Sequence, residues 1–219
     1  MIVLPRIPFG LARLPRSIGV DDPRLPTASV STNVLRLNSE PLPPAAIPEG
    51  NCDHAGRVAA VMDWLISLCG DYVPLRRRFI VAYFAFLAAE LGAHRGSLAE
   101  NLARYDGLYT PDDWLWSAPR PLPRAWLPGP DGMLPAEIAF WDGAQPLAIE
   151  LSARDTQGQA ELQAAGVRVL RITPDALADP ASVGALLPVS FRMFWRGQTL
   201  PASPFRRPIP RGVIAPATA

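Results

Sequence analysis

The hydrophobic pattern predicts two helices in the first regular part of the chain. From Ala55 to Cys69, apolar residues recur every three or four positions, which is the spacing of one face of an amphipathic helix. Asn51 or Asp53 can cap its start. From Pro74 to Leu91, apolar residues occupy most faces after three consecutive arginines, so a buried helix with a basic first turn is expected.

Two capping sequences then predict short helices. SLAE at residues 97–100 fits a capping box, which would start a helix running toward Tyr105. TPDD at residues 110–113 combines a capping threonine, a first-turn proline and two acids, and its helix would carry Trp114 and Trp116. These tryptophans could stack on bases, but filling a core is the commoner use. Four prolines between residues 119 and 128 exclude regular structure for about ten residues.

The most regular pattern lies between residues 134 and 187. Two apolar runs flank an Asp-Gly pair, which is a strong signal for a β-hairpin. A helix ended by Gly166, an alternating strand and a final helix capped by Thr173 follow. The expected elements are strands at 136–141 and 146–151, a helix at 157–165, a strand at 167–172 and a helix at 174–187. This order predicts an α/β fold, a small mixed sheet with flanking helices.

The two ends of the chain are rich in proline and show no sustained period, although the chain as a whole is 49% hydrophobic. They are expected to lack regular structure for most of their length and to pack partly on the helical region. Four segments result: a proline-rich extended arm at 1–50, a helical region at 51–130, an α/β core at 131–190 and a basic proline-rich tail at 191–219.

Charge is distributed unevenly along the chain. All 21 basic residues are arginine, and the net charge is only +1. Residues 21–180 hold 13 arginines and all 20 acids, a net of −7, so both ends are purely basic. Basic ends suit a polyanion, but solvated tails or arms packed on a partner subunit explain them equally well.

Composition excludes several other classes. Two cysteines and two histidines cannot supply the usual spacing of a structural zinc site. The longest strongly apolar run, Phe79–Ala89, is far shorter than the roughly 20 residues that cross a bilayer. The first residues are interrupted by prolines and do not resemble a secretory signal. A cytoplasmic protein with reduced thiols and no membrane contact is therefore expected.

Two glutamates mark the candidate chemistry. Pro135-Ala136-Glu137 falls on the first strand of the expected hairpin, and the apolar run ending in Glu150-Leu151-Ser152 falls on the second, 13 residues later. This arrangement resembles the restriction-endonuclease-like PD-(D/E)XK superfamily, in particular its very-short-patch-repair-like branch, over about residues 134–178. In that family an acid on each strand of a hairpin binds the catalytic metal ion, and a crossover helix and third strand follow.

The resemblance implies that Glu137 and Glu150 would bind Mg²⁺, which holds the scissile phosphate and activates a water. It places Ser152 where many members carry a lysine, and it makes Glu100 a candidate upstream acid. Two departures from the pattern stand out. Ser152 is neutral, and Glu137 comes one residue late, which could turn its side chain to the opposite face of the strand from Glu150.

These features indicate a nucleic-acid-directed protein, with DNA the more probable ligand than RNA. It would be either a Mg²⁺-dependent nuclease or a catalytically decayed relative. Candidate phosphate contacts are Arg168 and Arg171 on the third strand, and Arg206, Arg207 and Arg211 in the tail. Alternation along the strand cannot direct both Arg168 and Arg171 inward. The alternative is a non-enzymatic assembly subunit whose extended arms wrap a protein partner.

Overall fold

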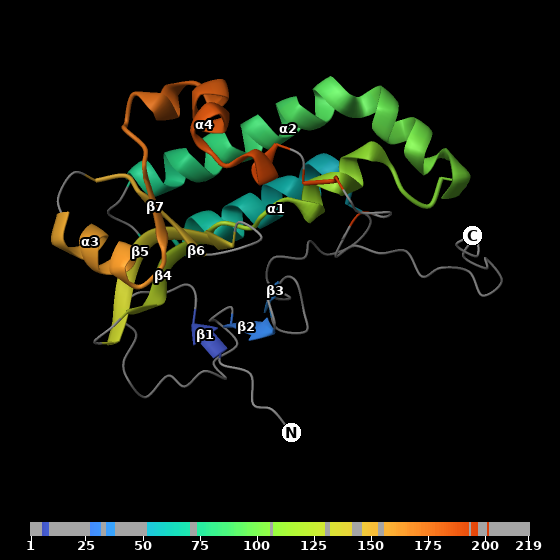
Figure 1. Cartoon of the computed structure of the whole chain (residues 1–219). Coiled ribbons are helices and arrows are strands. Elements are labelled where there is room, and N and C mark those ends of the chain that lie inside the picture. Colours follow the sequence, from blue (N-terminus) through green and yellow to red (C-terminus); the bar gives the residue numbers. More distant parts are fainter. Residues whose placement is uncertain are drawn as a thin grey trace.

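A four-stranded mixed sheet lies at the centre of the fold, with helices on both faces (Figure 1). The computed structural model describes three short strands between residues 6 and 37, and then residues 52–70, 74–105, 107–129, 132–141, 146–152, 156–192, 194–196 and 201. The sheet has the order β4-β5-β6-β7, formed by Leu122–Gly129, Gly132–Trp141, Pro146–Glu150 and Arg168–Arg171.

The connections match the expected hairpin and crossover. β5 pairs with both β4 and β6 in antiparallel fashion, and β7 joins β6 in parallel. Helix α3, Thr156–Ala164, makes the crossover between the parallel strands. It stops at Gly166, whose φ of 80° lies in the left-handed region that glycine adopts without a steric penalty. The Asp-Gly turn at residues 142–143 lies outside the described residues.

Helices α1 and α2 form the layer on the other side of the sheet. α1 spans His54–Ser67, and Asp53 caps it by accepting a 2.8 Å hydrogen bond from the Gly56 amide. α2 spans Pro74–Leu102, so it runs 29 residues and passes through the expected break at Ser97. The capping-box prediction there is wrong because the Ser97 hydroxyl donates to the carbonyl of His94, one turn earlier in the same helix.

The segment after α2 confirms one expectation and corrects another. The short 3₁₀ helix η2, Ala103–Tyr105, continues α2, and a second one, η3, spans Pro111–Ser117. At the start of η3 the Asp113 carboxylate accepts from the amide and hydroxyl of Thr110, and Trp114 and Trp116 are buried as core residues. The prolines that follow do not prevent strand formation: Pro123 and Pro128 lie in β4, which is an edge strand and tolerates residues without an N–H.

The final helix is shorter than the pattern predicted. Instead of one helix from 174 to 187, a 3₁₀ turn η4, Ala176–Ala178, precedes helix α4, Pro180–Leu186. Asp179 caps α4 by accepting from the amides of Ala181 and Ser182, whereas Thr173 accepts only a 3.4 Å bond from the Ala176 amide. A stronger cap and a following proline therefore restart the helix six residues later than expected. The 3₁₀ helix η5, Val189–Phe191, follows α4.

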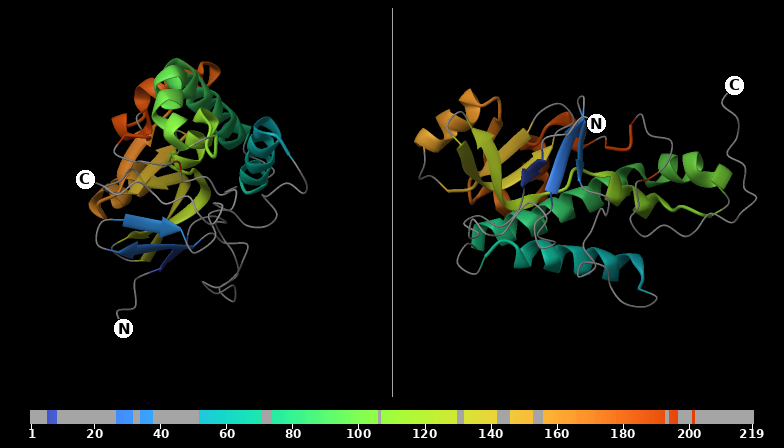
Figure 2. Two further views of the ribbon diagram at one scale, coloured as in Figure 1. Left: turned by 90° about the vertical axis from the view of Figure 1, so that its right-hand side faces the viewer. Right: turned by 90° about the horizontal axis from the view of Figure 1, so that it is seen from below.

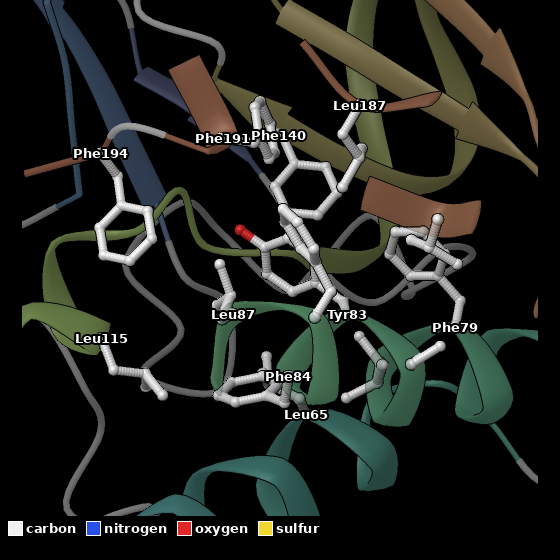
Figure 3. Close-up of a cluster of buried hydrophobic side chains, with 14 of the residues drawn as sticks. Leu65, Phe79, Tyr83, Phe84, Leu87, Leu115, Phe140, Leu187, Phe191 and Phe194 are labelled. Carbon is white, nitrogen blue, oxygen red and sulfur yellow. The ribbon is translucent and has the colours of Figure 1, made fainter. Parts of the chain in front are cut away.

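A buried aromatic cluster joins α2 to the sheet (Figure 3). The rings of Tyr83 and Phe140 lie 5.2 Å apart, and those of Phe140 and Phe191 lie 5.0 Å apart, both edge-on. The Tyr83 hydroxyl donates a 2.6 Å hydrogen bond to the carbonyl of Pro119. Each large apolar side chain buried here contributes roughly 1.5–3 kcal/mol, so this cluster fixes α2 against β5. A smaller apolar cluster, which includes Leu162 of α3, lies on the other side of the sheet.

The first 50 residues contain a second sheet, which the proline spacing did not predict. Its antiparallel strands are β1, Arg6–Pro8, β2, Thr27–Ser31, and β3, Val34–Leu37. β1 contacts β4, so this part of the expected extended arm lies against the main sheet (Figure 2). In the part of the chain that the structure describes, no helix has the length and apolar character that a membrane span requires.

Candidate functional site

The two predicted acids lie near the end of the β5–β6 ladder. Its last aligned pair is Ile138 and Ile149, so Glu137 precedes this pair on β5 and Glu150 follows it on β6, where Glu150 is aligned with Arg171 of β7. Ile149 and Leu151 pack on the α2 side of the sheet, so the side chain of Glu150 alternates to the other face. Glu137 makes its contact on the α2 side, with Arg76. The alternation therefore does not place the two acids on one face, which is the outcome that the one-residue shift of Glu137 allowed.

Glu137 closes the end of the β5–β6 ladder. Its Oε2 accepts a 2.5 Å hydrogen bond from the Leu151 amide and a 2.9 Å bond from the Ser152 amide. β6 ends at Glu150, so these amides are the first that leave the ladder. Only 12% of the Glu137 side chain is exposed, and a buried amide without a partner costs about 1–3 kcal/mol. Glu137 thus has a structural role that its position in the sequence did not reveal.

Arg76 of α2 faces the other carboxylate oxygen of Glu137. Its Nη2 lies 3.9 Å from Glu137 Oε1, and its Nη1 donates a 3.0 Å hydrogen bond to the Cys69 carbonyl. Arg76 therefore ties the end of the sheet to the turn after α1. Burial raises the pKa of the Cys69 thiol to about 11, although the charges of Arg76 and Arg124 oppose the shift.

Arg124 holds an unusual backbone conformation beside the same turn. Its φ is 53°, which makes it the one residue other than glycine in the left-handed region among those the structure describes. A Cβ added to Gly70, at the end of this turn, would come within 3.4 Å of Arg124 Nη1. The guanidinium therefore lies against the turn that also receives Arg76.

The second acid and the serine differ from what a nuclease site requires. Glu150 is half-buried with Oε1 enclosed, and its backbone carbonyl accepts from the Ile172 amide. Ser152 is half-buried and contributes its amide to Glu137. Ser152 stands where many members of the family carry a lysine. In this chain a positive charge comes from α2 instead, because Arg76 faces Glu137.

These residues do not fit a magnesium site. One oxygen of Glu137 accepts two backbone N–H donors and the other faces a guanidinium, so neither is presented to a cation. In the described residues, no group of three or more His, Cys, Asp or Glu side chains lies close enough to bind a metal ion. Glu100, the expected upstream acid, is exposed about 24 residues along α2 from Arg76, roughly 36 Å at the helical rise.

Exposed arginines surround this end of the sheet. Arg77 and Arg78 are exposed on the first turns of α2, next to Arg76. Arg78 donates a 3.4 Å hydrogen bond to the carbonyl of Pro174, three residues beyond Arg171. Arg168 and Arg171 are both exposed on β7, which satisfies the prediction that at least one faces outward. The predicted tail contacts Arg206, Arg207 and Arg211 lie outside the described residues.

Sequence reasoning missed the two arginines that complete the site. Arg76 was visible as part of a basic first turn, where a positive charge opposes the helix dipole and therefore calls for a nearby anion. That anion is Glu137. Arg124 gave no signal, because it lies in a segment that its prolines had marked as irregular. No family model, no curated protein and no solved structure matches the chain significantly.

Proposed function

We propose that this chain binds nucleic acid through a restriction-endonuclease-like core that does not cleave it. The order of hairpin, crossover helix and parallel strand, with an acid on each hairpin strand, supports the likeness to that fold. The observation that carries the loss of cleavage is the bonding of Glu137 to two backbone amides and its contact with Arg76. A carboxylate held in this way stabilises the sheet and is not available to activate a hydrolytic water.

The exposed arginines at this end of the sheet support binding to a phosphate backbone. Arg77, Arg78 and Arg171 are exposed and come from two elements that Arg78 and Pro174 tie together. The two predicted site acids, Glu137 and Glu150, are partly buried, whereas these arginines reach solvent. Contacts of this kind give affinity without reading sequence. DNA remains the preferred ligand, and the tail arginines would add to the same field.

Binding is tested with a fluorescent 20-base-pair duplex titrated at several salt concentrations. The triple variant Arg77→Gln, Arg78→Gln and Arg171→Gln should bind all sequences more weakly. If each arginine contacts one phosphate, the slope of log affinity against log salt should flatten by about 2.7, from roughly 0.9 per contact. Arg104→Gln, which removes an exposed arginine near the far end of α2, is the matched control. No binding of the intact chain at low salt would overturn the proposal.

Cleavage is tested separately, with plasmid, linear duplex and single-stranded substrates in the presence of Mg²⁺ or Mn²⁺. No metal-dependent hydrolysis is expected. Hydrolysis that disappears in Glu150→Gln while the variant still folds would show an active nuclease and contradict the non-cleaving part of the proposal. In the binding titration, a second triple variant, Arg206→Gln, Arg207→Gln and Arg211→Gln, is compared with the triple variant described above. The difference between their affinities separates the contribution of the tail from that of the arginines near the sheet.

The assembly-subunit alternative receives less support. It requires the N-terminal arm to reach a partner, whereas strand β1 of that arm contacts β4 of its own chain. The same titration discriminates the two hypotheses, because a scaffold subunit has no reason to bind a duplex with a salt slope that depends on Arg77, Arg78 and Arg171.

A further inference from the structure

We draw no further inference here: the strongest candidate, the exposed face of α2 formed by Val81, Ala85, Ala88, Gly92 and Gly96, is a stripe of mostly small residues, and nothing in the described part of the structure shows what covers it.

Discussion

Arg76 and Glu137 lie 3.9 Å apart, yet they come from the first turn of α2 and from the middle of the sheet. The same carboxylate accepts the amides of Leu151 and Ser152. One acid therefore connects a helix, a strand and the segment that leaves the neighbouring strand. Of the three arginines at the start of α2, the first contacts Glu137 within the fold, and the other two are exposed.

Replacement of Glu137 by alanine should lower the free energy of unfolding by about 2–4 kcal/mol. The change removes the hydrogen-bond acceptor of two partly buried amides and the carboxylate that faces Arg76. Each buried polar group that loses its partner costs about 1–3 kcal/mol. Urea denaturation gives the value. Glu137→Gln, which keeps an oxygen acceptor, should lose less. Glu100→Ala, at an exposed acid on α2, is the matched control and should change stability by less than about 0.5 kcal/mol. Equal effects at residues 137 and 100 would contradict the structural role.

Ser97→Ala should leave stability nearly unchanged, because Ser97 lies within α2 and is not a helix cap. Asp53→Ala should cost about 1 kcal/mol, since Asp53 accepts the Gly56 amide at the start of α1. Thermal unfolding of the two variants under the same conditions gives the comparison. A loss at Ser97 as large as that at Asp53 would mean that the helix breaks at residue 97 after all.

The sheet was the most predictable part of the fold. The Asp-Gly pair, the alternation and Gly166 are local signals, and they placed β5, β6, α3 and β7 to within a few residues. The two glutamates were found for the same reason. Their environment was not, because it depends on Arg76 and Arg124, which register and packing bring in from α2 and β4.

The errors also have physical causes. Pro123 and Pro128 were treated as breakers, but an edge strand has one side on which no N–H donor is needed. The capping-box interpretation of Ser97 ended the first helix at Leu91, yet burial of Leu98 and Leu102 carries α2 without a break through this segment. The hydrophobic pattern of neighbouring residues does not show contacts between segments that are distant in the sequence, and those contacts decided both cases.

Gly184→Ala should lower stability by about 1–3 kcal/mol. A Cβ at this buried position would lie 2.3 Å from Phe86 Cε2, so α4 and α2 would have to separate or the ring would have to turn. Gly92→Ala is the matched control, because nothing lies within 4 Å of its added Cβ, and it should raise stability by about 0.5–1 kcal/mol. Chemical denaturation measures both. The same sign of change at the two positions would show that α4 does not pack closely on α2.

Stability should fall as the pH rises from 9 to 11, in part because of Cys69. Its folded pKa is about 11 against an ordinary 9.0, so the unfolded chain releases the thiol proton first. The stabilisation is complete below pH 9 and is lost through pH 11, by about 2–3 kcal/mol. Cys69→Ala should flatten this part of the profile. Tyr83, whose pKa burial also raises, acts in the same direction, and the lowered pKa of Arg120 acts in the opposite one.

The difference between the profiles of the unchanged protein and Cys69→Ala isolates the thiol from Tyr83 and Arg120. It is measured by urea unfolding at half-unit pH steps under reducing conditions. Profiles that run parallel from pH 8 to 11 would show that the thiol titrates normally in the folded protein.

The two outer strands of the main sheet differ in how they discourage pairing with another molecule. β4 carries Pro123 and Pro128, which offer no backbone donor to an incoming strand. β7 is only four residues long, with exposed arginines at both ends, Arg168 and Arg171. Pairing of β7 with the same edge strand of a second molecule would bring these positive charges close together around a short apolar centre. Arg171, which is proposed to contact phosphate, and Arg168 should therefore also protect the folded chain from aggregation, and a variant with valine at both positions should lose solubility before it loses its fold.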